Sequence, residues 1–532
     1  MAMKIQEKQN MRIAAVFLVF FSLLWVSCGQ NARDSRGRLI ADSAVRRGRE
    51  LAAVYCQSCH ALPEPSQLNK ATWEKGVLPA MGPRLGIFRF GGVNYPSDIR
   101  DPSIGPAFYP SQPVLALWQW QEIIDYYSGM APDSMPRQPG HEAIDTGLTL
   151  FRAVMPPADG RPPLTSFVRV DTVGGRRQVV TGSLFPNVVR RWSFPLRLTD
   201  STFSRTAVVD MSFSGDSGLV CNIGNINPNN GRSGTASRWR YGADGRMLID
   251  STLLLGDLAR PVQVIPADLN GDGRGDLLIC EFGNLKGALT WMEGMEGGKY
   301  VRHVLRAQPG AIKAYVQDVN HDGLPDVWAL FAQGDEGIFL YINKGGGRFE
   351  EQRVLQFPPE YGSSYFELAD MNVDGFPDII YTCGDNADYS LVLKPFHGVY
   401  VYLNDGQNHF RQAYFYPING CYKAMARDFD GDGDLDLAVI SAFADFGHHP
   451  EEGFVYLENR GGLAFKPYGL PAGEVGRWLT MDAGDIDGDG RIDLVLGNFS
   501  EGPVLSRGKV DWKKGPSILV LMNINVIASK HL

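Results

Sequence analysis

The chain has 532 residues, of which 44% are hydrophobic, 11% aromatic and 21% charged. These proportions are those of globular domains and exclude a chain that is mostly disordered or coiled coil. The net charge of −8, from 51 basic and 59 acidic residues, argues against a nucleic-acid partner held by a basic surface. With 61 glycines, the composition favours a turn-rich, mainly β fold.

The N-terminus has the features of a secretory signal. Three basic residues precede an uncharged apolar run from Ile13 to Val26, which is short for a bilayer span but fits the core of a signal peptide. A small residue, Ser27, and then Cys28 follow, and this ending resembles a bacterial lipoprotein signal. The resemblance implies cleavage before Cys28, lipidation of its thiol and anchoring to the membrane of the cell envelope, in the periplasm or at the outer membrane. A plain signal peptide is the alternative. We therefore expect a signal over residues 1–27 and a tether over 28–40.

The strongest chemical motif is Cys56-Gln57-Ser58-Cys59-His60. C-x-x-C-H is the attachment signature of c-type haem, in which two thiols add to the vinyl groups and the histidine binds the iron. A zinc site would need a second ligand pair nearby, and a redox C-x-x-C would need an α/β domain. The motif predicts one covalent haem c, bound through Cys56 and Cys59 with His60 as an axial ligand.

The surrounding segment resembles a mono-haem cytochrome c domain, which we place at residues 41–135. Apolar residues at helical spacing predict a closing helix within residues 113–132. For the sixth ligand, Met81 in a Pro/Gly loop is favoured over Met130 at the end of that helix. The insert over residues 85–110 departs from a minimal cytochrome and could cover a haem edge. Residues 136–164 are rich in proline and are expected to be a linker.

Five segments then repeat the pattern D-x-[DN]-x-D-G-x-x-D followed by an apolar run. They start at Asp268, Asp318, Asp370, Asp428 and Asp485, so one repeat is 50 to 58 residues long. This is the size of a propeller blade with several short strands. Two degenerate segments, from Val170 and Val209, bring the count to seven. We expect a seven-bladed β-propeller over residues 165–525, with six or eight blades as alternatives.

The acidic loops have the donor set of a hard cation. Side chains at positions 1, 3, 5 and 9, with the carbonyl of position 7, resemble the oxygen ligands of an EF-hand loop, although no helix follows. The pattern matches the FG-GAP/VCBS repeat family, also found in integrin-type propellers, and this resemblance implies about five calcium ions. A metal-free Asp/Gly turn is the alternative. The implied ligands are Asp268, Asn270, Asp272, Asp276, Asp318, Asn320, Asp322, Asp326, Asp370, Asn372, Asp374, Asp378, Asp428, Asp430, Asp432, Asp436, Asp485, Asp487, Asp489 and Asp493.

Polar loops between strands provide a candidate working face. The longest follows Cys383, and equivalent loops of successive blades should meet on one face around the central channel. A solvated polar loop is the alternative. The candidate residues are Asp385, Asn386, Asp388, Tyr389, Lys394, His397, Glu451 and Glu452, with His448, His449 and Glu501 in neighbouring blades.

The whole layout resembles a group of bacterial exported proteins that fuse a mono-haem cytochrome c domain to FG-GAP/VCBS repeats. No flavin, quinone or nicotinamide motif and no nucleophile elbow stands beside the haem motif. The favoured function is therefore electron transfer to a redox partner protein, with the propeller binding a partner or a carbohydrate. The alternatives are a periplasmic haem-linked dehydrogenase and a calcium-propeller sugar lyase or dehydratase. The remaining cysteines should be buried small apolar residues, with Cys383 and Cys421 as a candidate bridge.

Overall fold

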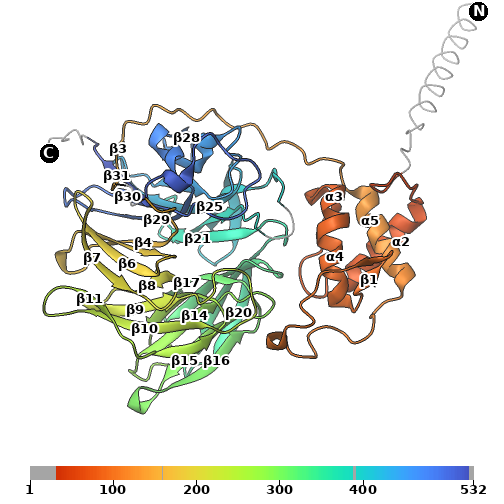
Figure 1. Cartoon of the computed structure of the whole chain (residues 1–532), viewed down its shortest axis with the longest axis horizontal. Coiled ribbons are helices and arrows are strands. Elements are labelled where there is room, and N and C mark those ends of the chain that lie inside the picture. Colours follow the sequence, from red (N-terminus) through yellow and green to blue (C-terminus); the bar gives the residue numbers. More distant parts are fainter. Residues whose placement is uncertain (1–31, 158–159, 388–390, 526–532) are drawn as a thin grey trace, which may run out of the picture.

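The computed structural model describes residues 32–157, 160–387 and 391–525. Figure 1 shows a small helical domain beside a large β domain, joined by an extended segment that crosses from α5 to the far side of the β domain. The predicted signal sequence and Cys28 lie outside the described residues. Within those residues, none of the helices is both long enough and apolar enough to cross a membrane.

The helical domain is built on two helices of equal length that pack against each other. These are α2 (Asp42–Tyr55) and α5 (Leu117–Met130). The helices approach closely at Gly48, where an added Cβ would lie 1.9 Å from the backbone oxygen of Glu122. The predicted closing helix is present, and it buries Trp120, Ile123 and Tyr127 against α2 and the short helices. The smaller elements are η1 (Pro65–Gln67), α3 (Lys70–Thr72), η2 (Trp73–Val77), α4 (Leu78–Met81), η3 (Gly82–Leu85), β1 (Arg89–Phe90), β2 (Val93–Asn94) and η4 (Pro102–Ile104).

The β domain is a seven-bladed propeller, and the prediction of seven blades is confirmed. Each blade is an antiparallel sheet whose strands follow one another from the inside of the ring to the outside, except that β12 also pairs with β10 in blade 2 and that β3 is the outermost strand of blade 7. The first two blades contain β4 (Thr165–Asp171), β5 (Gln178–Ser183), β6 (Val188–Ser193) and β7 (Arg197–Phe203), then β8 (Val208–Met211), β9 (Ser217–Asn222), β10 (Gly234–Tyr241), β11 (Met247–Ile249) and β12 (Leu255–Leu258). These two blades lack the acidic loop and correspond to the degenerate repeats.

The other five blades carry the acidic loops, each between the first and second strands. Blades 3 and 4 contain β13 (Pro261–Ala267), β14 (Asp276–Glu281), β15 (Ala288–Gly294), β16 (Tyr300–Arg306), β17 (Ala311–Gln317), β18 (Asp326–Phe331), β19 (Gly337–Asn343) and β20 (Phe349–Gln356). Blades 5 and 6 contain β21 (Ser363–Ala369), β22 (Asp378–Cys383), β23 (Gly398–Asn404), β24 (Phe410–Pro417), β25 (Cys421–Arg427), β26 (Asp436–Ser441), β27 (Phe454–Asn459) and β28 (Phe465–Tyr468). Blade 7 contains β29 (Trp478–Gly484), β30 (Asp493–Asn498), β31 (Ile518–Asn523) and β3 (Phe151–Val154).

The second strands of these five blades explain the apolar runs in the sequence. Every residue of β14, β18, β22, β26 and β30 is buried. A strand that is covered on both faces has no solvent side, so its sequence is continuously apolar where a half-exposed strand would alternate. Successive blades pack these strands into the cores of the ring.

The ring is closed by a strand that the sequence analysis assigned to the linker. β3 lies within residues 136–164, yet it pairs with β31 as the outermost strand of blade 7. The propeller therefore begins at Phe151 and not at residue 165. Phe151 is buried in the core cluster of blades 6 and 7, against Phe429 and Tyr456. The prolines around β3 masked this strand, because prolines favour linkers and turns in a sequence-based assessment.

Hydrogen bonds from side chains join the seven innermost strands in an unbroken circle. In each case one polar side chain of an inner strand bonds to the backbone of the next inner strand. The seven contacts are Ser166 to Val208 (2.7 Å), Asp210 to Val264 (3.2 Å), Gln263 to Ala314 (2.8 Å), Tyr315 to Phe366 (3.1 Å), Glu367 to Ala426 (2.7 Å), Lys423 to Met481 (2.8 Å) and Asp482 to Val170 (2.8 Å). The chain thus fixes the blades to one another at the centre of the ring as well as through their apolar faces.

Candidate functional site

The C-x-x-C-H motif lies at the C-terminal end of α2. The helix ends at Tyr55, and Cys56 caps it by donating its N–H to Ala52. Cys56 is half-buried and Cys59 is exposed, and both are free thiols. Burial raises the pKa of the Cys56 thiol to about 11. The Nδ1 of His60 lies 2.7 Å from the carbonyl oxygen of Ala61, an arrangement that orients the ring and leaves Nε2 as the nitrogen for a metal.

The two candidate methionines differ in environment. Met81 is partly buried and packs against the core cluster of the helical domain, the same cluster that Cys56 contacts. Met130 ends α5 with 57% of its side chain exposed. Met81 is the last residue of α4, although the sequence suggested a loop. Proline is tolerated in the first turn of a helix, and Pro79 lies in the first turn of α4. The helical backbone of η2 can therefore continue directly into α4.

The residues around the motif fit a haem c. Cys56 and Met81 pack against one apolar cluster, and Cys59 and His60 follow Cys56 closely in the chain. Two thiols, one imidazole and one thioether form the donor set of that group. Leu62, Val77 and Leu85 are partly buried on the same cluster and leave apolar surface for a macrocycle to cover. Of the two thioethers, Met81 fits better because it already belongs to this cluster.

The five acidic loops share one backbone conformation. Position 4 has a positive φ in every loop, with Gly271, Gly431 and Gly488 in three of them and the non-glycine residues His321 (φ 59°) and Val373 (φ 59°) in the others. Position 6 is always a glycine with positive φ, and its N–H donates to the Oδ2 of the aspartate at position 1. A β-branched residue such as Val373 adopts this conformation only under strain, so the loop shape is imposed by its bonds.

The aspartate at position 9 serves the fold. Asp276, Asp326, Asp378, Asp436 and Asp493 are all fully buried. In each loop its Oδ2 accepts the N–H of position 2, and its Oδ1 accepts an N–H at the end of the third strand. The predicted metal ligand at position 9 therefore also ties the loop to its own blade. Burial raises the pKa of Asp436 to about 7 and that of Asp493 to about 6.

Two of the loops bring three carboxylates together. In the loop of blade 6, oxygens of Asp428, Asp430 and Asp432 all lie within 4.8 Å of one another, and in the loop of blade 7 those of Asp485, Asp487 and Asp493 do so. These loops fit a hard cation on their donor chemistry. The other three loops have asparagine at position 3, whose Nδ2 donates to the aspartate at position 5: Asn270 to Asp272, Asn320 to Asp322 and Asn372 to Asp374.

The candidate working face differs from its prediction. Asn386, Lys394, His397 and Glu452 are each at most 3% exposed, so they cannot form a solvated binding surface. Asp388 and Tyr389 lie outside the described residues. The loop folds inward because its polar groups bond to backbone: Asn386 donates to Val392 (2.9 Å), and Lys394 donates to the carbonyl oxygen of Glu360 (3.0 Å). Burial lowers the pKa of His397 well below its usual value, so this imidazole is neutral.

The other polar candidates on this side are in ion pairs. Glu451 pairs with His449 at 3.1 Å and Glu501 with Lys513 at 2.6 Å, while His448 pairs with Asp445 at 2.9 Å. The groups of side chains that could hold a metal, within the described residues, do not include His448 and His449. The buried Cys383 and Cys421 are free thiols, so the candidate bridge between them is not formed.

This side of the propeller faces the helical domain. Acidic loops follow the first strand of a blade, so the loops between second and third strands lie at the opposite end of the blades. Three such loops reach the helical domain: Asn230 bonds to it, Val392 packs against its core cluster, and Lys286 lies near Gly105. The propeller thus presents its acidic loops on one face and carries the helical domain on the other.

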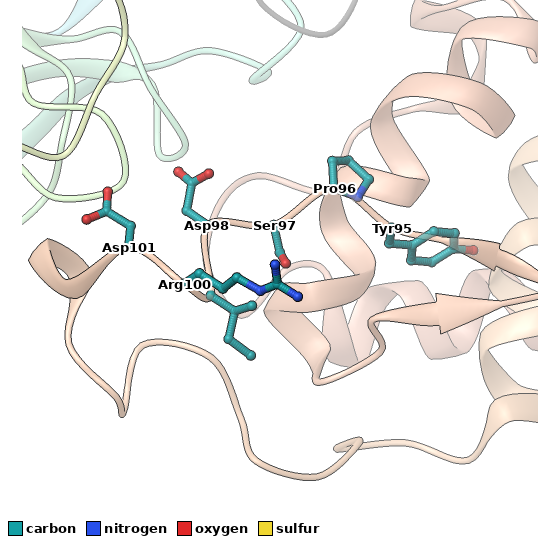
Figure 2. A pocket seen from close by; sticks show the side chains of 7 residues that line it. Tyr95, Pro96, Ser97, Asp98, Arg100 and Asp101 are labelled. Carbon is teal, nitrogen blue, oxygen red and sulfur yellow. The ribbon is translucent and has the colours of Figure 1, made fainter.

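The insert at residues 85–110 makes part of this contact. Asn230 donates from its Nδ2 to both Asp98 and Asp101, at 3.0 Å each. Figure 2 shows these two carboxylates on the side of the insert that points toward the propeller. Residues Tyr95 to Asp101 also line a cavity of about 540 Å³. The unusual length of the insert is the one feature of the sequence that relates to these contacts.

Glu360, in the connection between β20 and β21, is a buried acid that the sequence analysis missed. It is 7% exposed, its Oε2 has no hydrogen-bond partner within the described residues, and burial raises its pKa to about 8, partly offset by the charge of Lys394. Burial raises the pKa of Tyr127 in α5, and the charge of Glu360 contributes to this shift. The acid is thus held near the boundary of the two domains.

Replacing Glu360 by glutamine is expected to reduce the pH dependence of stability. The pKa of this carboxyl is higher in the folded chain than the value of about 4.3 for an unfolded one. The folded state therefore binds the proton more tightly, and this contribution to stability is present at low pH and lost as pH rises from about 4 to about 8. Urea unfolding at several pH values should show a steeper decline for the wild type than for Glu360→Gln. Glu350→Gln, at an exposed pair with Lys344, is the matched control; equal slopes for all three proteins would contradict the expectation.

Residues 318–381 and 428–496 match the FG-GAP-like repeat. The chain therefore contains FG-GAP-like repeats on a seven-bladed propeller. Among solved structures it is similar to virginiamycin B lyase from Staphylococcus aureus, with 12% identity, a TM-score of 0.43, and 70% of this chain and 99% of that one covered. It is also similar to Sqt1 from Saccharomyces cerevisiae, with 10% identity, a TM-score of 0.42, and 72% and 100% covered. Likenesses this distant say nothing about function.

Proposed function

We propose that this chain is an exported, lipid-anchored c-type cytochrome that transfers electrons, with a propeller that binds a partner protein or a carbohydrate. The observation that carries the proposal is the position of the C-x-x-C-H motif: it caps α2 on the apolar cluster that also contains Met81. A seven-bladed propeller with FG-GAP-like repeats fits the binding role. The fit of the donor set supports haem over the other metal sites considered.

Each residue of the site has a distinct task in this proposal. Cys56 and Cys59 hold the group covalently, His60 supplies the proximal nitrogen and Met81 the distal sulfur. Haem bound in this way would accept and release single electrons, and a thioether ligand raises its potential relative to a second histidine. Trp73 and Tyr127, whose ring centroids lie 4.3 Å apart in the core cluster, help to exclude water from this side of the domain.

The test is the spectrum of the protein purified after expression with a haem-attachment system. A single haem per chain that stays with the polypeptide after denaturation, and that can be reduced and reoxidised reversibly, would support the proposal. A protein that matures in the same cells without covalent haem, while a control cytochrome acquires it, would refute it. Reduction by sugars or alcohols would indicate a dehydrogenase instead.

We further propose that calcium occupies the acidic loops, as the resemblance to FG-GAP/VCBS repeats implies. Clustered carboxylates repel one another when no cation is present, and two loops gather three of them within 4.8 Å. Bound ions would hold the loops in the conformation that Val373 adopts only under strain. Elemental analysis after gentle purification should find calcium, and its removal by chelation should lower the melting temperature of the propeller.

Replacing Met81 by alanine is expected to abolish the thioether–iron absorption band near ~695 nm and to lower the reduction potential. The reason is that Met81 packs on the cluster next to the motif, whereas Met130 is 57% exposed. Met130→Ala is the matched control and should leave the absorption band and the reduction potential unchanged. Redox titration with visible spectroscopy measures the two effects, and the opposite pattern would assign the ligand to Met130.

A further inference from the structure

The innermost strands carry four cations and four carboxylates, and one of these carboxylates, Asp171, is paired with a residue outside the strands. Besides Asp171, which is paired with Arg176 near the end of β4, their ionisable acidic and basic side chains are four cations and three carboxylates. The cations are Arg169, Lys313, Lys423 and Arg427, and the carboxylates are Asp210, Glu367 and Asp482. All seven lie on strands that surround the axis of the ring, where a propeller has its central channel.

The carboxylates are already engaged. Glu367 pairs with Arg427 at 2.9 Å and accepts the N–H of Ala426. Asp482 lies 3.8 Å from Arg169 and accepts the N–H of Val170. Asp210 accepts the N–H of Val264 and is the carboxylate that offsets part of the charge of Lys313.

The two lysines are crowded against the same tyrosine. The Nζ of Lys423 lies 4.6 Å from the ring centroid of Tyr365, and that of Lys313 lies 5.8 Å from it. Lys313 also lies 4.7 Å from the ring of Tyr315. Lys313, Tyr365 and Lys423 each occupy the third position of consecutive inner strands, so they stand at one level around the axis.

Within the described chain, neither ammonium group has a carboxylate at ion-pair distance. Lys423 donates one hydrogen bond, to the carbonyl oxygen of Met481, and keeps two N–H groups for other acceptors. The contacts of Lys313 are with aromatic rings, which attract a cation but accept no strong hydrogen bond. Burial lowers the pKa of both lysines, and this effect is partly offset by Asp210 for Lys313 and by Asp482 for Lys423. The charge of Arg169 lowers the pKa of both lysines further, and that of Lys313 lowers the pKa of Lys423. Two ammonium groups held together out of bulk water favour a counterion.

We propose that the central channel of the propeller binds a small oxyanion between Lys313 and Lys423. A phosphate or sulfate presents several oxygens at once, so it can accept from both ammonium groups. The hydroxyl of Tyr365 lies beside them, 3.2 Å from the hydroxyl of Tyr315, which already donates to the carbonyl oxygen of Phe366. The site is separate from the haem motif and from the acidic loops. It also lies inside the circle of inter-blade bonds, so the ligand would add a further link between blades 4, 5 and 6.

The experiment titrates inorganic phosphate into the full-length protein, with sodium chloride at matched ionic strength as the reference. Calorimetry should show one site, and phosphate should raise the melting temperature more than chloride does. Lys313→Met should weaken phosphate binding by about thirtyfold or more, the loss that follows when one charge of a buried contact is removed.

Lys344→Met is the matched control, since Lys344 pairs with Glu350 at the surface of blade 4. It should bind phosphate as the wild type does. Lys423→Arg keeps the positive charge and the donor to Met481, so it should still bind phosphate. This variant distinguishes a loss of phosphate binding caused by the missing charge from a loss caused by unfolding. The proposal is overturned if the wild type shows no phosphate-specific binding or stabilisation, or if Lys313→Met binds phosphate as tightly as Lys344→Met.

Discussion

Replacing both Cys56 and Cys59 by serine is expected to abolish covalent haem attachment completely. Serine hydroxyls do not form the thioether bonds to the vinyl groups, so the variant keeps at most haem that is lost on denaturation. The single variants should retain one bond each and an altered spectrum. Denaturing electrophoresis with haem staining measures the effect directly. Because Cys59 is exposed and Cys56 is half-buried at the end of α2, the substitutions should leave the helical domain folded.

Ser58→Ala is the control for this experiment. Ser58 stands between the two thiols, and its hydroxyl bonds to the carbonyl of Tyr55, so the change alters the same turn without removing a thiol. It should stain for haem as the wild type does. If the double serine variant still carried haem through denaturation, the motif would not be the attachment site. If neither protein stained while a control cytochrome did, the proposed function would fail as a whole.

Replacing Asp436 by alanine is expected to lower the free energy of unfolding by about 3–6 kcal/mol. Asp436 is fully buried, and its carboxylate accepts from the N–H of Phe429, the N–H of Asn459 and the hydroxyl of Tyr456. Alanine would leave these donors without an acceptor in the core, and each unsatisfied buried group costs about 1–3 kcal/mol. Urea unfolding monitored by fluorescence measures the loss.

Asp434→Ala tests whether the loss comes from the buried bonds or from the charge of the loop. Asp434 is in the same acidic loop but is only half-buried, so its removal should cost much less. Both measurements should be made with calcium and with a chelator. A large effect of Asp436→Ala in the presence of chelator shows that position 9 supports the fold on its own. Equal effects of the two variants would contradict this reading.

The blades with an acidic loop could be predicted from sequence because each repeat contains its own turn and strand signals. Each repeat has an acidic turn with glycine at position 6, and a fully buried strand follows it. These signals lie within a few residues of one another and recur at Asp268, Asp318, Asp370, Asp428 and Asp485. Blades 1 and 2 lack the acidic loop, and only their strand–loop–strand pattern predicts them. The structure confirms that they bring the number of blades to seven. The C-x-x-C-H motif and the closing helix α5 were equally local.

The remaining features depend on contacts between distant parts of the chain. Nothing near His397 indicates that its loop folds inward beneath the helical domain, because that burial depends on Gln138 and Glu360, which come from elsewhere in the sequence. The strand at Phe151 looks like a linker until β31 is beside it. The polar residues of this loop predict an exposed surface, whereas tertiary packing buries Asn386, Lys394 and His397.

The pairing of β3 with β31 also bears on the order in which the protein is made. β3 is the first propeller strand in chain order, and its partner β31, which ends at Asn523, is the last strand of the described propeller. Until then β3 has an unpaired backbone edge, and such edges recruit other strands. The propeller can close only after β31 has been synthesised, whereas residues 32–133 precede every strand of the propeller and can fold earlier. A chain truncated anywhere in blade 7 would keep its cytochrome-like segment while leaving the ring permanently open and prone to aggregate.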